Sequence, residues 1–153
     1  MSFPLIIGLV GAYHSANHVY MLTEYIHGRD MFSVMREVKI ITKEIAQFFI
    51  ACLLLSLEYM HREHYIHRDL KPENAIVDSH GRVHLIDMGT AKQLSEDQFF
   101  KTFTIVGRPH YMAPEIFEGY GYSFEADIWS LGCILYELLC YSPPWRNPTD
   151  DPF

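Results

Sequence analysis

The sequence predicts an α+β fold, because strand-like segments gather near the N-terminus and two long helices follow. Two runs rich in β-branched and aromatic residues, 5–11 and 18–25, flank a polar turn at 13–17. Two segments with long apolar runs, 42–61 and 125–140, have the length of core helices. The 153 residues are enough for one domain with a hydrophobic core.

The first two runs are predicted to pair as a hairpin. A hairpin alone is not stable in water, so this one should depend on the rest of the chain. The sequence Gly28-Arg29-Asp30 then breaks the strand pattern, and a short helical segment is expected at 31–36.

The first long helix is predicted to begin after Thr42 and to end near His61. Thr42 is a good N-cap residue, and Glu44 places an anion in the first turn, where the helix dipole favours it. Apolar residues lie on nearly every side of this segment, so we expect the helix to be buried in a larger body.

Short strands are expected at 65–66, 75–77 and 83–86, and a turn at 78–81 joins the last two. Residues 88–115 show no sustained period and are predicted to form a long loop, which in a compact domain is usually functional. Ser123 is expected to open the second long helix, 125–140, and Pro143 and Pro144 are expected to end it.

Composition and charge narrow the possible functions. Apolar residues make up 49% and charged residues 20%, as in a globular protein. Twelve cationic and nineteen acidic side chains leave a net charge of −7, which argues against nucleic acid as the main partner and suits a basic one. Neither apolar run, 48–55 or 128–136, reaches the ~20 residues of a bilayer span, so no membrane span is expected.

Cysteine usage indicates a reducing compartment. The three cysteines, Cys52, Cys133 and Cys140, are an odd number and contain no C-x-x-C pair, so neither a disulfide framework nor a zinc ribbon is expected. No secretory signal follows Met1. These features favour an intracellular, cytoplasmic protein.

Three motifs follow one another in a specific order. Residues 67–74 read His-Arg-Asp-Leu-Lys-Pro-Glu-Asn, 87–89 read Asp-Met-Gly and 113–115 read Ala-Pro-Glu, and residues 127–132 follow on the second long helix. Either Asp69 or Asp87 alone would be better interpreted as a solvated loop carboxylate. The ordered set, however, resembles the catalytic loop, the magnesium motif and the A-P-E motif of protein kinases.

This resemblance implies phosphoryl transfer, in which an acceptor hydroxyl is held in line and the charge on the γ-phosphoryl group is neutralised. Asp69 would orient the hydroxyl and accept its proton, and Lys71 would direct a cation at the γ-phosphate. Asn74 and Asp87 would hold Mg²⁺, which prefers oxygen ligands. The lysine in Arg-Asp-Leu-Lys-Pro-Glu-Asn is typical of serine/threonine kinases.

The match is closer to the AGC group, and within it to the cyclic-nucleotide-dependent kinases, above all the cGMP-dependent branch. The phrases that carry it are residues 7–10, 20–25, 31–34 and 109–115. The resemblance implies a partial kinase fold, with the last N-lobe strands and hinge at 1–27 and a mainly helical C-lobe at 28–153. Cyclic-nucleotide-binding regulatory domains would lie outside this chain, and whether cGMP, cAMP or neither is the regulator stays open.

The same resemblance implies an ATP site and a substrate surface. The hinge Glu24–Ile26 would bind adenine through its backbone, Thr23 would be a small gatekeeper, and Ile76 would lie under the base. The residues expected around the nucleotide are Thr23, Glu24, Ile26, Asp30, Glu73, Asn74, Ile76 and Asp87. Three carboxylates, Asp30, Glu73 and Glu137, fall where such kinases bind arginines upstream of the target serine or threonine, so protein substrates with basic residues are the expected partners.

The long loop resembles an activation segment. Thr104, in Lys101-Thr102-Phe103-Thr104, stands at the phosphoacceptor position of the AGC group. A phosphate there would add about −2 charge, and Arg68 and Lys92 are the cations expected to pair with it. The alternative is an unmodified polar threonine in a loop.

The sequence departs from the family pattern in three respects. Met88 replaces the usual phenylalanine, which is a mild change because Met also packs irregular apolar sites. Arg108 replaces a threonine, and we expect it to pair with Asp69 and to repel Lys71. The glycine-rich loop and the V-A-x-K lysine are absent, as if the chain began at the fourth N-lobe strand.

Two functional classes therefore remain. The first is a serine/threonine kinase using ATP and Mg²⁺, and the second is a catalytically silent, kinase-like binding or structural remnant. We expect the chain alone to bind ATP poorly and to transfer phosphate slowly or not at all.

Other candidate sites are weaker. His61, His64 and His67 recur at every third residue, but a zinc site needs a fourth ligand and one consistent face, so structural histidines are the better interpretation. Asp127 is expected to hold the backbone of the catalytic loop, as in the family. The alternative is a surface acid that the helix dipole favours.

Overall fold

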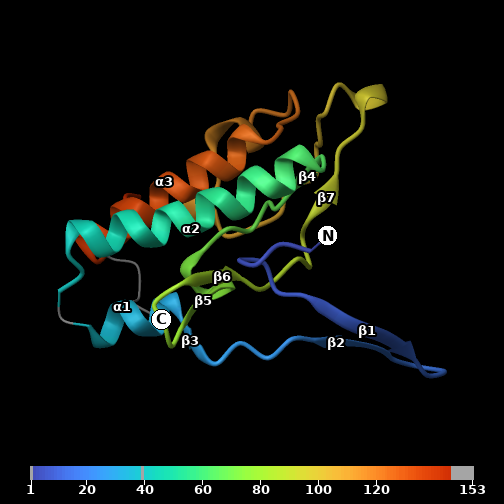
Figure 1. The fold of residues 1–153 in the computed structure, drawn as a ribbon. Coiled ribbons are helices and arrows are strands. Elements are labelled where there is room, and N and C mark those ends of the chain that lie inside the picture. The colour runs from blue at the N-terminus through green and yellow to red at the C-terminus, as the bar shows by residue number, and fades with distance from the viewer. Residues whose placement is uncertain (1, 39, 146–153) are drawn as a thin grey trace.

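The computed structural model describes residues 2–38 and 40–145. Two long helices pack side by side, small antiparallel sheets lie on one side of them, and a two-stranded arm projects from the body (Figure 1). The predicted α+β class is confirmed.

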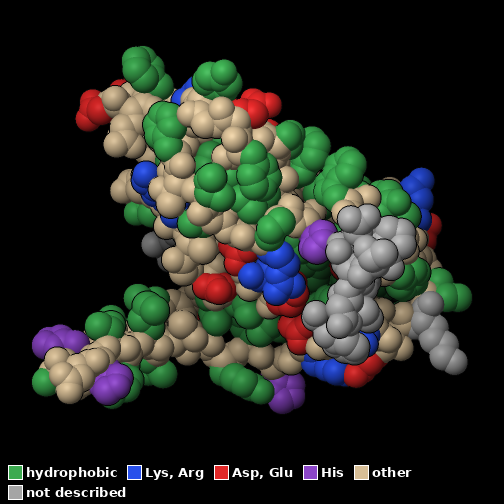
Figure 2. All heavy atoms as spheres, turned by 180° about the vertical axis from the view of Figure 1, so that it is seen from behind, with side chains coloured by type: hydrophobic (Ala, Val, Ile, Leu, Met, Phe, Trp, Pro, Cys, Tyr) green, Lys and Arg blue, Asp and Glu red, His purple; other side chains and the backbone are tan. Residues whose placement is uncertain are grey.

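The projecting arm is the predicted hairpin. Strand β1 (Leu9–His14) pairs antiparallel with β2 (Val19–Thr23), with an irregularity between Leu9 and Gly11. The turn is tighter than predicted, because β1 continues through His14 and the amide of Ser15 donates to the carbonyl of His18 at 2.8 Å. The arm extends away from the core (Figure 2), and its large apolar side chains, Leu9, Val10, Tyr13, Val19, Tyr20, Met21 and Leu22, are exposed.

A three-stranded antiparallel sheet joins the arm to the helices. Its order is β3 (Gly28–Asp30), β5 (Ala75–Asp78) and β6 (Val83–Leu85). Ile6 forms a parallel bridge to Leu85, so the N-terminal segment runs along β6. The predicted turn after β5 is confirmed, and the Asp78 carboxylate accepts the backbone amides of His80 and Arg82 there.

Among the described residues, three helices follow the predicted order. Helix α1 (Met31–Glu37) is capped by Asp30, which accepts the amide of Ser33 at 2.8 Å. Helix α2 (Lys43–Arg62) begins after Thr42, whose hydroxyl accepts the amide of Ile45. Helix α3 (Glu125–Cys140) packs against α2. The shared core of the helices and β6 includes Met31, Leu53, Leu57, Met60, Leu85, Ile134 and Leu138.

Both ends of α3 differ from the prediction. Ser123 makes no side-chain cap, because the helix begins after Phe124, which itself has helical backbone angles. At the other end, Tyr141 adopts a left-handed conformation with φ of 60° and terminates the helix before the prolines are reached.

Helix α2 is buried on one side only, contrary to prediction. Leu53 is fully buried, whereas its neighbour Leu54 is 46% exposed, and Ile45, Phe48 and Leu55 are exposed as well. Among the described residues, α2 is also the one helix long and apolar enough to cross a membrane. Its packing against α3 and β6 is that of a core helix.

The predicted long loop contains short regular elements. Strand β7 (Lys92–Gln93) pairs with β4 (Tyr65–Ile66), and single 3₁₀ turns form at η2 (Glu96–Gln98), η3 (Pro109–Tyr111) and η4 (Pro114–Ile116). Thr102 bridges to Tyr122. A second apolar cluster, Ile66, Leu94, Met112, Ala113, Ile116, Tyr122 and Ala126, anchors the loop beside α3.

Candidate active site

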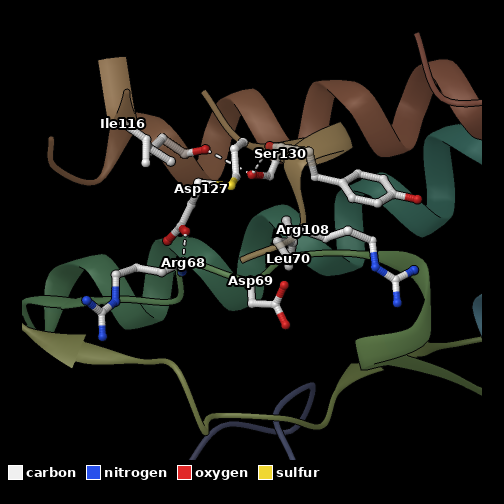
Figure 3. A pocket seen from close by; sticks show the side chains of 10 residues that line it. Arg68, Asp69, Leu70, Arg108, Ile116, Asp127 and Ser130 are labelled. Atoms are coloured by element: carbon white, nitrogen blue, oxygen red, sulfur yellow. Dashed lines mark hydrogen bonds between the residues drawn. The ribbon is translucent and has the colours of Figure 1, made fainter. Parts of the chain in front are cut away.

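The predicted catalytic loop, residues 67–74, is held by Asp127 in the first turn of α3. The Asp127 carboxylate, 1% exposed, accepts the amides of His67 at 2.8 Å and Arg68 at 2.9 Å. It also lies 2.8 Å from Nε2 of His61 on α2. Arg68 has a φ of 72°, a conformation that non-glycine residues adopt only under constraint. The predicted role of Asp127 as a brace for this loop is confirmed (Figure 3).

Asp69 lies at the centre of a network that also contains Lys71 and Asn74. The Lys71 ammonium is 2.5 Å from Oδ2 of Asp69, and both side chains are largely buried. The Asn74 amide donates to the Asp69 carbonyl at 2.9 Å and to the same Oδ2 at 3.2 Å. Two donors therefore orient Oδ2 of Asp69.

Gly107 allows the loop that follows to approach Asp69 closely. Its φ is 106°, and a Cβ at this position would lie 2.5 Å from the Arg68 carbonyl and 3.7 Å from Oδ1 of Asp69. Any other residue would therefore clash with the catalytic loop. Arg108, the next residue, therefore lies at the edge of the site around Asp69.

A backbone hydrogen bond at Ile86 links the two segments that carry Asn74 and Asp87, the predicted magnesium ligands. The amide of Ile86 donates to the carbonyl of Asn74 at 3.0 Å, so Asp87 follows directly after this contact. Oδ1 of Asp87 accepts the amide of Gly89 at 2.8 Å, and the side chain is exposed. One carboxylate and one amide oxygen fit the hard-oxygen preference of Mg²⁺.

Thr90 links the two motifs. Its hydroxyl donates to the carbonyl of His67 at 2.9 Å, and its own carbonyl accepts Nε of Arg68 at 2.7 Å. The segment after Asp87 is thus fixed to the catalytic loop.

His67 is fully buried. Burial lowers its pKa, although the Asp127 charge opposes this shift. Its Nδ1 accepts the amide of Asp69 at 3.3 Å, so a neutral imidazole serves the loop as a structural acceptor. Within the described residues no three His, Cys, Asp or Glu side chains gather as a metal site, and the His64 ring packs against that of Phe100 in a tilted arrangement.

The sequence predicted that Arg108 would pair with Asp69, but the structure pairs it with another carboxylate. Its guanidinium forms an ion pair with the Glu73 carboxylate, and Figure 3 shows the Arg108 side chain directed away from Asp69. The prediction was wrong because the path after Gly107 carries Arg108 past Asp69 to the 3₁₀ turn η1 (Pro72–Asn74).

The three carboxylates predicted to contact substrate arginines have partners within the chain. Asp30 accepts both the amide and the hydroxyl of Ser33. Glu73 pairs with Arg108. Glu137 is buried and accepts the Tyr111 hydroxyl at 2.6 Å. Burial raises the pKa of Glu137, and burial together with the Glu137 contact raises the pKa of Tyr111.

The predicted phosphosite Thr104 is exposed, and its carbonyl accepts the Tyr122 hydroxyl at 2.6 Å. The two cations expected to serve it have other contacts. Lys92 lies 3.2 Å from the hydroxyl of Thr102, which is buried, and Arg68 bonds to the carbonyl of Thr90. Phosphorylation of Thr104 stays a prediction.

The predicted nucleotide residues other than Glu73, Asn74 and Asp87 lie in the three-stranded sheet, at the end of the arm, and in the connection between them. Ile76 pairs in register with Asp30, so these two meet between β5 and β3. Thr23 ends β2 on the arm, and the adjoining Glu24 bonds through its amide to the carbonyl of Gly8 at 2.9 Å. Ile26 lies in the connection from the arm to β3.

A small pocket lies between the catalytic loop and α3 (Figure 3). Its lining includes Asp69, Leu70, Arg108, Asp127 and Ser130, and its volume of about 10 Å³ is near the minimum for one water. It is therefore a packing void next to the site and not the place of a nucleotide.

Sequence reasoning missed several residues of the site. His61 on α2 forms a hydrogen bond with Asp127, and no sequence motif around His61 indicates this contact. Ser130 donates to the carbonyl of Tyr111 at 2.7 Å and so ties α3 to η3. The glycine before Arg108 was the one sequence signal that the segment at Gly107 approaches the catalytic loop closely.

The chain matches the protein kinase domain family over residues 1–152. It belongs to the protein kinase family. It is 40% identical over 148 residues to the cGMP-dependent protein kinase of Toxoplasma gondii, covering 97% of this chain and 14% of that protein.

Two further relatives are also cyclic-nucleotide-dependent protein kinases that match most of this chain. The chain is 39% identical to human cGMP-dependent protein kinase 2, over 94% of its own length and 19% of that protein. It is 38% identical to the catalytic subunit of the cAMP-dependent protein kinase of Arthrobotrys oligospora, over 93% of its own length and 27% of that subunit. The predicted resemblance to cGMP-dependent kinases is confirmed, and the chain spans less than a third of these three relatives.

Proposed function

We propose that this chain carries the catalytic loop of a serine/threonine protein kinase. The reaction would transfer the γ-phosphate of ATP to a serine or threonine hydroxyl of a protein substrate. The observation that carries the proposal is the arrangement of Asp69. Its Oδ2 accepts hydrogen bonds from Lys71 and Asn74, and Asp127 holds the backbone of the same loop at His67.

The geometry supports a separate role for each group. Oδ1 of Asp69 would accept the proton of the acceptor hydroxyl, because Oδ2 already receives two donors. Lys71 would turn its ammonium towards the incoming phosphoryl group. Bound Mg²⁺ would neutralise charge on the phosphate oxygens, and Asn74 and Asp87 would hold it.

We also propose a kinase lobe for each part of the chain, a class of acceptor segment and a cellular location. Residues 1–27 would form the end of an N-lobe with its hinge, and residues 28–153 would form part of a C-lobe. Acceptor segments with basic residues suit the net charge of −7, and a cytoplasmic location suits the cysteine usage.

A silent, kinase-like module is the second candidate. The 153 residues contain no Gly-x-Gly-x-x-Gly run to cover the phosphates, and the β1–β2 arm is exposed. Both features favour weak nucleotide binding by this chain.

Phosphate transfer from Mg-ATP to a peptide with one serine tests the proposal. We expect slow transfer to serine and none to a matched tyrosine peptide, and we expect Asp69→Asn to lower the rate about 100-fold or more. Asp97→Asn, which removes an exposed carboxylate in η2, is the control and should leave the rate unchanged. Bound nucleotide without Asp69-dependent transfer would favour the silent candidate.

A further inference from the structure

The ion pair between Arg108 and Glu73 joins the loop after Gly107 to the catalytic loop. Glu73 lies in η1, directly before Asn74, so it marks the rim of the site where an acceptor segment must approach. The side chains are 47% and 28% exposed, so solvent and an incoming ligand can reach the pair. A pair this exposed is held weakly enough to exchange.

The pair engages only one side of the carboxylate. A single nitrogen of Arg108 bonds to Oε1 of Glu73. The other oxygen, Oε2, is buried and accepts no hydrogen bond from any described residue. Because Oε2 is buried, an incoming guanidinium must displace Arg108 in order to bond to this carboxylate.

The surroundings of Glu73 favour a cation. Glu137 lies near enough for the Glu73 charge to contribute to its raised pKa, after the larger effect of burial. The Arg108 charge acts in the opposite direction on both Glu137 and Tyr111. Arg108 therefore supplies positive charge to a patch that contains two carboxylates.

We propose that Arg108 is an internal competitor for Glu73: it occupies the carboxylate that would bind an arginine of an acceptor peptide, and so lowers the preference of this chain for arginine-containing peptides. The inference rests on the proposed function only for the identity of the ligand as an acceptor peptide. Arg108 is thus a specificity-determining residue. Its removal should create selectivity for arginine that the wild-type chain lacks.

Two fluorescein-labelled peptides of one sequence provide the test, one with arginines before the serine and the other with citrulline, which has the same shape without the charge. Binding to the 153-residue chain is measured by fluorescence anisotropy. We expect the wild-type chain to bind the two peptides within about threefold of each other. In Arg108→Ala, affinity for the arginine peptide should rise about tenfold, as one charge-assisted hydrogen bond can provide, and affinity for the citrulline peptide should not change.

Two further variants isolate the contact. Arg62→Ala removes the same charge from an exposed pair with Glu58 on α2 and should leave both affinities unchanged. Adding Glu73→Gln to Arg108→Ala should abolish the gain. An unchanged ratio in Arg108→Ala, an equal gain in Arg62→Ala, or a gain that survives Glu73→Gln would each overturn the proposal.

Phosphate transfer is measured on the same proteins. A shift in peptide selectivity without transfer by any variant would overturn the proposed function and leave the role of Arg108 standing. Transfer without a shift in selectivity would overturn the role of Arg108 and leave the proposed function standing.

Discussion

Asp127 shows how a single buried carboxylate can determine the conformation of a catalytic loop. It satisfies two consecutive backbone amides, of His67 and Arg68, and the second of these residues has a left-handed conformation. The His61 ring contacts the same carboxylate, so both long helices contribute to one contact. The loop conformation therefore depends on the packing of α2 against α3.

Asp127→Ala is predicted to lower the free energy of unfolding by about 2–4 kcal/mol. The substitution leaves buried amides without an acceptor, and such groups cost more than an ordinary lost hydrogen bond. Urea denaturation followed by circular dichroism measures the change. Glu125→Ala, an exposed acid in the same first turn, is the matched control and should cost below about 1 kcal/mol. Equal losses in the two variants would contradict the assignment of Asp127 as a brace.

The sequence identified the chemistry of individual residues better than their partners. The motif order sufficed to select Asp69, Lys71, Asn74 and Asp87, and the structure brings the first three into one network. It did not suffice for Arg108, because a side chain of that length can reach several carboxylates and the backbone path at Gly107 decides among them. Partner choice in such cases depends on tertiary structure.

At the scale of elements, the helices were the most predictable part of the chain. The bounds of α2 follow from Thr42 and the apolar run, and the structure confirms them. The start of α3 was not predictable from Ser123, because backbone bonds and packing of Phe124 begin that helix without a side-chain cap. Burial was overestimated for α2, because a run that is apolar on all sides does not tell which side has a neighbour.

Adjacent leucines on α2 test this one-sided packing. Leu53→Ala is predicted to cost about 3 kcal/mol or more, because Leu53 is fully buried and its truncation leaves a cavity. Leu54→Ala should cost below about 1 kcal/mol, because that side chain is 46% exposed. Thermal and urea unfolding of the two variants give the comparison. A larger loss for Leu54→Ala would mean that the outer side of α2 is covered in solution.

For the whole molecule, the catalytic loop lies where α2, α3 and the small sheets meet, while the arm projects away from it (Figure 1). The family and the α+β class were predictable from the sequence, because ordered motifs persist whatever the packing around them. The partners of Glu73 and Glu137 were not predictable, because they lie on segments far apart in the chain, whereas Asp30 bonds locally to Ser33 as the cap of α1. An acidic net charge therefore does not amount to a free acidic surface.

The proposed kinase activity requires Asn74 and Asp87 to form one metal–nucleotide site beside Asp69. The most direct measurement uses nuclear magnetic resonance with Mn²⁺-ATP, because bound Mn²⁺ broadens the signals of nearby amides. We predict that the amides of 69–74 and 87–89 broaden first, and that Asp87→Asn abolishes the effect while Asp97→Asn preserves it. Broadening centred elsewhere, or unchanged by Asp87→Asn, would contradict the assignment of Asn74 and Asp87 to this site.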